Sequence, residues 1–136
     1  MAPPSGYLLL ALKANVMYFV AMSAAHWSGW KVPILFIYYD TPYYSYQDKI
    51  ISFCAATYAI LNLAAVKHLS VVPYVIASLA LTTTGLCAIN SSNDLHSILP
   101  TGAVTKAYWL QTGVIGALTG TIALLYAYAS TGKKST

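Results

Sequence analysis

Four long apolar runs, each bounded by polar residues, dominate the pattern of this chain. They cover residues 7–25, 50–66, 71–89 and 107–129. A helix rises 1.5 Å per residue, so about 20 apolar residues can cross about 30 Å of hydrocarbon. A lone strand would leave its backbone groups unpaired in lipid, whereas a helix pairs them internally. The pattern therefore predicts an all-α, polytopic membrane protein, a four-transmembrane-helix bundle in a single domain that covers residues 1–136.

The connection between the first two runs, residues 26–48, is long and rich in aromatic side chains. Its apolar stretch, residues 32–39, is too short to span a membrane. Trp and Tyr settle at the membrane surface because one end of each side chain is apolar and the other is polar. We therefore expect an interfacial loop that lies at the surface or dips part-way into the membrane.

Two roles for this aromatic loop are open. It can be a belt that fixes the depth of the protein, or it can be the lid of a lipid, sterol or quinone site. In the second role, the candidate ligand-binding residues are Trp27, Trp30 and Tyr39, with Lys13 from the first run.

Composition supports a membrane setting and narrows the partners. The chain is 58% hydrophobic and 7% charged, whereas soluble domains carry about 25% charged residues. So few charges would not keep a protein of this size dispersed in water. The net charge of +4 comes from scattered Lys and forms no basic stripe, which argues against nucleic-acid binding. The expected partners are membrane lipids and other membrane protein subunits.

The connections predict the orientation of the chain. The turn at residues 67–70 is very short, so the second and third spans should form a tight hairpin. An even number of spans puts both termini on the same side as Lys67, together with Lys133 and Lys134 and no acid. The positive-inside rule counts Lys and Arg, and it favours both termini on the cytosolic, stromal or matrix side.

The last four residues, Lys133 to Thr136, look like the dilysine retrieval signal of eukaryotic endoplasmic reticulum membrane proteins. Lys133 and Lys134 stand fourth and third from the end, and the expected topology places them in the cytosol. The same pair also suits an ordinary positive anchor after a last span. We expect an endoplasmic reticulum membrane, with an organellar inner or thylakoid membrane as the alternative.

Lys13 is the charge that lies clearly inside a span, which makes it a functional candidate. It lies near the start of the first run, so its long side chain can extend to the nearby interface. The alternative is a buried ammonium that pairs with Asn15, with Asn62 or with a headgroup phosphate.

Cys54 and Cys87 lie on neighbouring antiparallel spans, near the same face of the predicted bundle. Their spacing fits neither a zinc motif nor a C-x-x-C redox pair. They are either two buried thiols that pack as small apolar side chains or a disulfide that staples the hairpin. The disulfide requires an oxidising compartment on that side.

The sequence predicts neither a catalytic residue nor a metal site, and it leaves the cofactor open. The apolar runs contain no carboxylate, which argues against a proton-coupled exchanger. Five polar residues map to the side opposite the termini, but their spacing is not diagnostic of a metal site. They are His26, Asp40, Asp48, Asp94 and His96.

The fourth run contains a stripe of small residues. Thr112 and Gly113 precede Gly116 and Gly120, which stand four apart. Small residues at this spacing let another helix approach closely. The stripe therefore predicts a helix-packing face, either within the bundle or against another protein.

One span, a long aromatic loop, a hairpin and a last span form a layout that resembles the small DoxX-like four-helix membrane proteins. The likeness also includes the stretch His26-Trp-Ser-Gly-Trp-Lys-Val-Pro. The acidic residue expected in the second span of that group is missing from residues 50–66, so no site residues are carried over.

The sequence thus favours a small non-enzymatic membrane protein that acts as a scaffold or accessory subunit of a larger complex. The first alternative is a lipid, sterol or quinone binding protein or enzyme. The second is a subunit of a respiratory or photosynthetic membrane complex.

Overall fold

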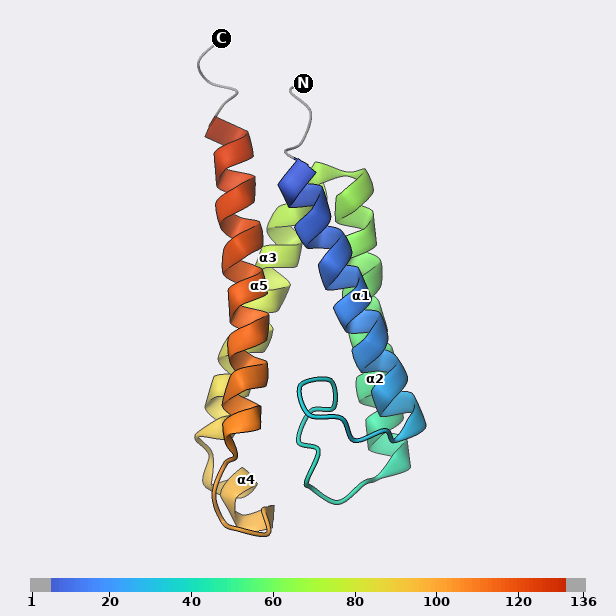
Figure 1. Cartoon of the computed structure of the whole chain (residues 1–136), viewed down its shortest axis with the longest axis vertical. Coiled ribbons are helices and arrows are strands. Elements are labelled where there is room, and N and C mark those ends of the chain that lie inside the picture. The colour runs from blue at the N-terminus through green and yellow to red at the C-terminus, as the bar shows by residue number, and fades with distance from the viewer. Residues whose placement is uncertain (1–5, 132–136) are drawn as a thin grey trace.

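The computed structural model of the chain describes residues 6–131, which form helices and connecting loops without strands (Figure 1). Four long helices account for most of the fold, and they are joined by a 3-10 turn, η1, and one short helix, α4. In chain order the elements are α1 (Gly6–Ser28), α2 (Ser45–Lys67), η1 (Leu69–Val71), α3 (Val72–Asn90), α4 (Asn93–Ile98) and α5 (Lys106–Thr131).

The four long helices are each long and apolar enough to cross a membrane. This confirms the all-helical fold and the number of candidate spans. The first residue of α1, the last residue of α5 and the α2–α3 turn lie at the same end of the molecule, as an even number of spans requires (Figure 1). The pair Lys133–Lys134 lies outside the described residues.

The helix bounds differ from the expected ones where helix ends depend on local hydrogen bonds. The first helix continues to Ser28, the second begins at Ser45, and the connection between them shrinks to residues 29–44. Helix α4, which begins at Asn93, was not expected. Ser92 caps it by accepting a hydrogen bond from the Leu95 N–H at 3.3 Å.

Gly29 ends α1 in a Schellman motif. Its φ is +69°, a conformation that glycine adopts without steric cost. The Trp30 N–H donates to the Ala25 carbonyl at 2.8 Å, which pairs a carbonyl of the last turn. A Cβ at Gly29 would lie 2.9 Å from Cζ of Tyr43, so the loop packs against the helix end where a larger residue would not fit.

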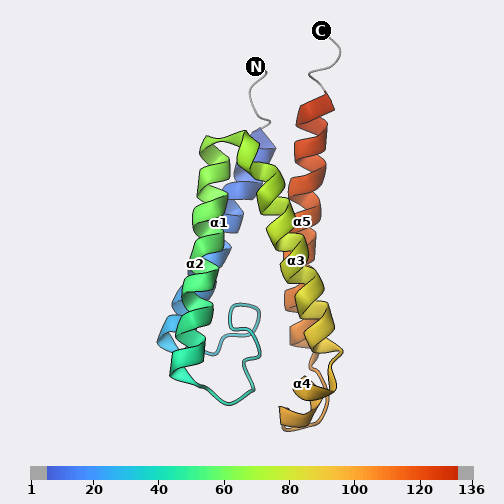
Figure 2. The same ribbon diagram turned by 180° about the vertical axis from the view of Figure 1, so that it is seen from behind.

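The long helices form two antiparallel pairs, α1 with α2 and α3 with α5, which have the most extensive contacts in the fold. The pairs meet at the end that carries the α2–α3 turn and diverge towards the other end (Figures 1 and 2). The loop of residues 29–44 lies between them at the open end. The fold is therefore a four-helix arrangement whose two pairs are separated at one end by the loop of residues 29–44, which we call the wedge. It is not a parallel-sided bundle.

A heptad-like seam joins α1 to α2. Apart from Ala25, the buried residues of α1 recur at alternating intervals of four and three, and they are Leu8, Leu12, Asn15, Phe19, Met22 and His26. Asn15, Phe19 and His26 contact α2 directly. The facing residues of α2 include Ala55 and Ala59, both buried. Alanine lets the two helix backbones approach closely, as small residues do at helix interfaces in membranes.

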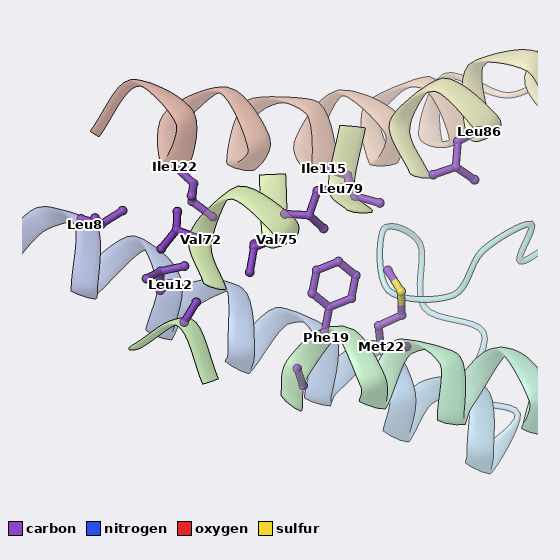
Figure 3. Packing of buried hydrophobic residues seen from close by; sticks show 13 residues of the cluster. Leu8, Leu12, Phe19, Met22, Val72, Val75, Leu79, Leu86, Ile115 and Ile122 are labelled. Atoms are coloured by element: carbon purple, nitrogen blue, oxygen red, sulfur yellow. The ribbon is translucent and has the colours of Figure 1, made fainter. Parts of the chain in front are cut away.

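The two pairs are joined by apolar packing where they meet. Val72 and Val75 of α3 are fully buried, and they lie among Leu8 of α1 and Ile122 of α5 (Figure 3). Leu86, further along α3, belongs to the same cluster, against which Ile37 and Tyr38 of the loop also pack (Figure 3). Side-chain packing thus joins the two pairs directly at the closed end, whereas at the open end the loop packs between them.

Candidate functional site

Three polar pairs lie along the seam between α1 and α2. Asn15 donates to Oδ1 of Asn62 at 2.9 Å, and both side chains are fully buried. The hydroxyl of Ser52 donates to the Ser23 carbonyl at 2.8 Å. The third pair, His26 with Asp48, lies nearest the open end. Buried polar pairs at such positions fix the register of two helices, because a slip would leave each group without its partner.

His26 has both ring nitrogens engaged. Nδ1 lies 3.0 Å from Oδ1 of Asp48, and the backbone N–H of Ile37 donates to Nε2 at 2.9 Å. A nitrogen that accepts an N–H bond carries a lone pair, so Nε2 is unprotonated and Nδ1 carries the proton. His26 is therefore a neutral imidazole that donates to the carboxylate and accepts from the loop.

The surroundings hold this arrangement in place. The His26 ring is fully buried and stacks on Phe36 of the loop, with centroids 4.0 Å apart and planes at 22°. Asp48 lies in the first turn of α2, where the helix dipole favours a negative charge. Its second oxygen accepts from the Tyr44 N–H at 3.3 Å. The pair thus ties the start of α2, the end of α1 and the loop together.

This His–Asp pair has the composition of a general-base dyad, but a substrate could not reach its ring nitrogens. A histidine base needs a free, unprotonated ring nitrogen within reach of the proton that it removes, and in His26 only Nε2 is unprotonated. Here that nitrogen is occupied by the Ile37 N–H, and the ring is closed off from the surface. The geometry gives the pair a structural role.

A second link runs across the open end through the carbonyl of Ile34. It accepts from the Tyr18 hydroxyl of α1 at 3.0 Å and from Nε2 of Gln111 of α5 at 2.9 Å. One backbone oxygen of the loop therefore bridges the two helix pairs. Side chains from both pairs thus satisfy this carbonyl of the irregular loop.

The loop backbone is strained at two positions. Ile34 has φ of 76° and Tyr38 has φ of 56°, both in the left-handed region that side chains disfavour. Such residues cost about 1–3 kcal/mol each and persist where the surroundings over-determine them. The bonds to the Ile34 carbonyl supply that constraint. Phe36, which lies between Ile34 and Tyr38 in the sequence, is only 2% exposed.

Tyr38 joins the loop to α3. Its hydroxyl donates to Oδ1 of Asn90 at 3.2 Å, and the Asn90 amide donates to the Thr112 hydroxyl of α5 at 3.1 Å. Partial burial disfavours the phenolate and raises the pKa of Tyr38 to about 12. The group is therefore a hydroxyl donor across the physiological pH range.

A small apolar cluster covers the foot of α5, which is its first turn at the open end. Leu95 and Leu99 pack with Tyr108, which is 2% exposed. The rings of Tyr38 and Tyr39 meet the Tyr108 ring edge to face, with centroids at 4.9 and 5.6 Å. An open pocket of about 640 Å³ lies beside this cluster, between the loop, the end of α3 and α4.

The structure does not bring the four candidate ligand-binding residues together. Trp27 and Trp30 are 59% and 70% exposed, and Tyr39 packs on Tyr108 instead. Lys49 lies over the Trp27 ring at 5.3 Å, a cation–π contact. Lys13 is exposed on α1, half a helix away from the tryptophans.

Lys13 does not make the buried pair that we considered. Asn15 and Asn62 bond to each other and leave the lysine outside the seam. Its extension to the membrane interface or to a headgroup stays a prediction.

The small residues of α5 divide between two faces. Thr112 is buried on Asn90, and a Cβ at Gly116 would lie 3.3 Å from Cγ2 of Thr83, so Gly116 faces α3. Gly113 and Gly120 are exposed, and a Cβ at either would meet no atom within 4 Å. The stripe is therefore partly an internal contact and partly an outward surface.

The two cysteines are free thiols, and Cys54 is exposed. Cys87 is partly buried, so the two side chains differ in exposure. A disulfide that staples the hairpin stays a prediction. The sequence predicted a tight antiparallel hairpin, whereas α2 and α3 diverge from their turn and the loop lies between the helix pairs (Figure 2).

Sequence reasoning placed His26 and Asp48 on the same side but did not pair them. It put Asp48 in the loop, whereas the residue lies inside α2. Within residues 6–131, no group of three or more His, Cys, Asp or Glu could hold a metal ion. Gln111 and Asn90 were also missed, although each is a polar residue at or near the end of an apolar run.

Comparison with protein families, with curated proteins and with solved structures gave no match for this chain.

Proposed function

We propose that this chain is a small integral membrane protein that works as a non-enzymatic scaffold or accessory subunit of a membrane complex. The proposal rests on one observation, which is that the buried polar side chains bind the loop of residues 29–44. The His26–Asp48 pair, which has the composition of an acid–base dyad, is fully engaged in holding the loop. Gln111 of α5 and Tyr18 of α1 both donate hydrogen bonds to the Ile34 carbonyl of the same loop.

The outer faces of the helices are what such a protein offers to other molecules. Large apolar side chains are exposed on α1, α2, α3 and α5, as they are in proteins surrounded by lipid or by other membrane subunits. They include Met17 at 68%, Ile60 at 66%, Leu81 at 74% and Leu124 at 74% exposed. We propose that a partner helix docks on the outward face of α5, where Gly113 and Gly120 allow close approach.

Gly120→Leu is expected to displace a partner chain while leaving this protein folded. A Cβ at Gly120 meets no atom of its own fold within 4 Å, whereas a leucine side chain there would hold a docked helix away. The measurement is chemical cross-linking in native membranes, followed by mass spectrometry of the tagged protein purified in mild detergent. The expected result is at least a fivefold loss of the cross-linked partner.

Gly116→Leu is the matched control, because the same change on the same helix points inwards at Thr83. It should lower thermal stability by about 1–3 kcal/mol through overpacking. Equal partner recovery from wild type and Gly120→Leu would exclude docking on this face of α5.

We propose an endoplasmic reticulum membrane as the location, which the Lys133–Lys134 pair supports. An organellar inner or thylakoid membrane, where it would serve a respiratory or photosynthetic complex, is the alternative. Replacing both lysines by serine should move the protein beyond the endoplasmic reticulum in fluorescence microscopy. An unchanged location for a folded double variant would leave only the charge-anchor interpretation of the pair.

A further inference from the structure

The open pocket at the divergent end has an apolar wall with one acidic group. Tyr38, Ala88, Ile89, Leu95 and Ile98 supply most of its lining. Thr41, Ser92 and Asp94 supply the polar part. Its volume of about 640 Å³ lies within the range of about 300–1,000 Å³ that is typical of small-molecule sites.

The hydroxyl groups that line this pocket donate hydrogen bonds to other groups of the protein. Tyr38 donates to Oδ1 of Asn90 at 3.2 Å, Thr41 to the Tyr38 carbonyl at 2.7 Å, and Ser92 to the Ile89 carbonyl at 2.7 Å. With their protons engaged, the Tyr38 and Thr41 hydroxyls can act towards a ligand as acceptors, whereas the Ser92 oxygen already accepts from the Leu95 N–H. The pocket therefore offers hydrogen-bond acceptors and calls for a donor.

Asp94 gives the pocket its charge. Its carboxylate receives no hydrogen bond or ion pair from any residue between 6 and 131, and no other lining residue is ionised at neutral pH. An anionic ligand would meet the like charge of Asp94. A phosphate-containing lipid headgroup meets the same obstacle, whereas an ammonium group meets a carboxylate and acceptor oxygens.

We propose that this pocket binds a single-chain amphiphilic amine, with its ammonium group at Asp94 and its alkyl chain against Ala88 and Ile89 at the end of α3. In a chain that spans a membrane, α4 lies where α3 leaves the hydrocarbon. The charged head then stays at the interface while the alkyl chain enters the apolar region. This binding role is independent of partner docking on α5, which lies on a different surface.

The test measures binding of dodecylamine and of dodecanol, which share a chain and differ in charge, to the purified full-length protein by native mass spectrometry from detergent. Dodecylamine is protonated at neutral pH, as lysine is. An exposed ion pair is worth up to about 1 kcal/mol, so the amine should bind about fivefold more tightly than the alcohol. Asp94→Asn should remove that preference and keep the alcohol affinity.

Ala88→Phe fills the pocket and should weaken both ligands. It is a change at an exposed position, and an unchanged thermal melt would show that it leaves the fold intact. Equal affinity of the wild-type protein for amine and alcohol would overturn the proposal, as would an amine preference that survives Asp94→Asn. Displacement of dodecylamine by equimolar phosphatidylethanolamine would also contradict it, because the occupant would then be a membrane phospholipid.

Discussion

Replacing Asp48 by leucine is expected to destabilise this protein more than any other single polar substitution. The change removes the acceptor for the buried Nδ1–H of His26 and for the Tyr44 N–H. Hydrogen bonds to charged groups are worth about 1.5–3 kcal/mol, and a buried donor left unpaired adds its desolvation cost. We expect a loss of about 3 kcal/mol in the free energy of unfolding, measured by thermal denaturation with tryptophan fluorescence.

Two variants separate this hydrogen bond from a general effect of charge. Asp48→Asn keeps an oxygen acceptor for His26 and should lose less than half as much stability. Asp94→Leu removes a carboxylate from an exposed position, and surface changes of this kind usually stay within about 0.5 kcal/mol. If Asp48→Leu and Asp94→Leu had the same midpoint of thermal denaturation, the His26–Asp48 pair would not stabilise the fold as its geometry indicates.

Phe36→Ala should have an effect of similar size through packing. Phe36 is 2% exposed, stacks on the His26 ring and lies between the two strained loop residues. Truncating a buried phenylalanine typically costs about 3–5 kcal/mol, part of it from the cavity left behind. The loop should loosen, and the midpoint of thermal denaturation should fall by several degrees.

Trp30→Ala provides the comparison within the same loop. Trp30 is larger than Phe36 but 70% exposed, so its removal leaves no internal cavity. Its melting temperature should stay close to that of the wild type. Equal destabilisation by the two substitutions would show that the loop rests on the surface rather than between the helix pairs.

The four helices could be predicted because each is a long, predominantly apolar run, a signal that depends on local composition alone. Their ends could not, because they depend on local hydrogen bonds such as the Trp30 to Ala25 bond beyond Gly29. The seam of α1 was readable in principle. Asn15 and His26 recur in phase with Leu8, Leu12 and Phe19, which marks them as inward residues rather than surface ones.

The wedge could not be predicted from sequence, because its bonds join distant parts of the chain. The Ile34 carbonyl meets Gln111, 77 residues away, and Tyr38 meets Asn90, 52 residues away. Aromatic composition indicated only that the loop prefers an interface. The loop contains both exposed and buried aromatic residues, since Trp30 is exposed while Phe36 is buried.

The central claim is that the loop of residues 29–44 is a fixed brace and that the interior polar groups serve it. Amide hydrogen exchange of the full-length protein in lipid nanodiscs tests this directly, by comparing residues 34–38 with residues 101–105. The Ile37 N–H is bonded to His26 and the Phe36 N–H to the Val32 carbonyl at 2.8 Å, so the first segment should exchange at least a hundredfold more slowly than an exposed loop, a difference of about 2.7 kcal/mol. Exchange of both segments at the same fast rate would contradict the account, and would identify residues 29–44 as a mobile lid.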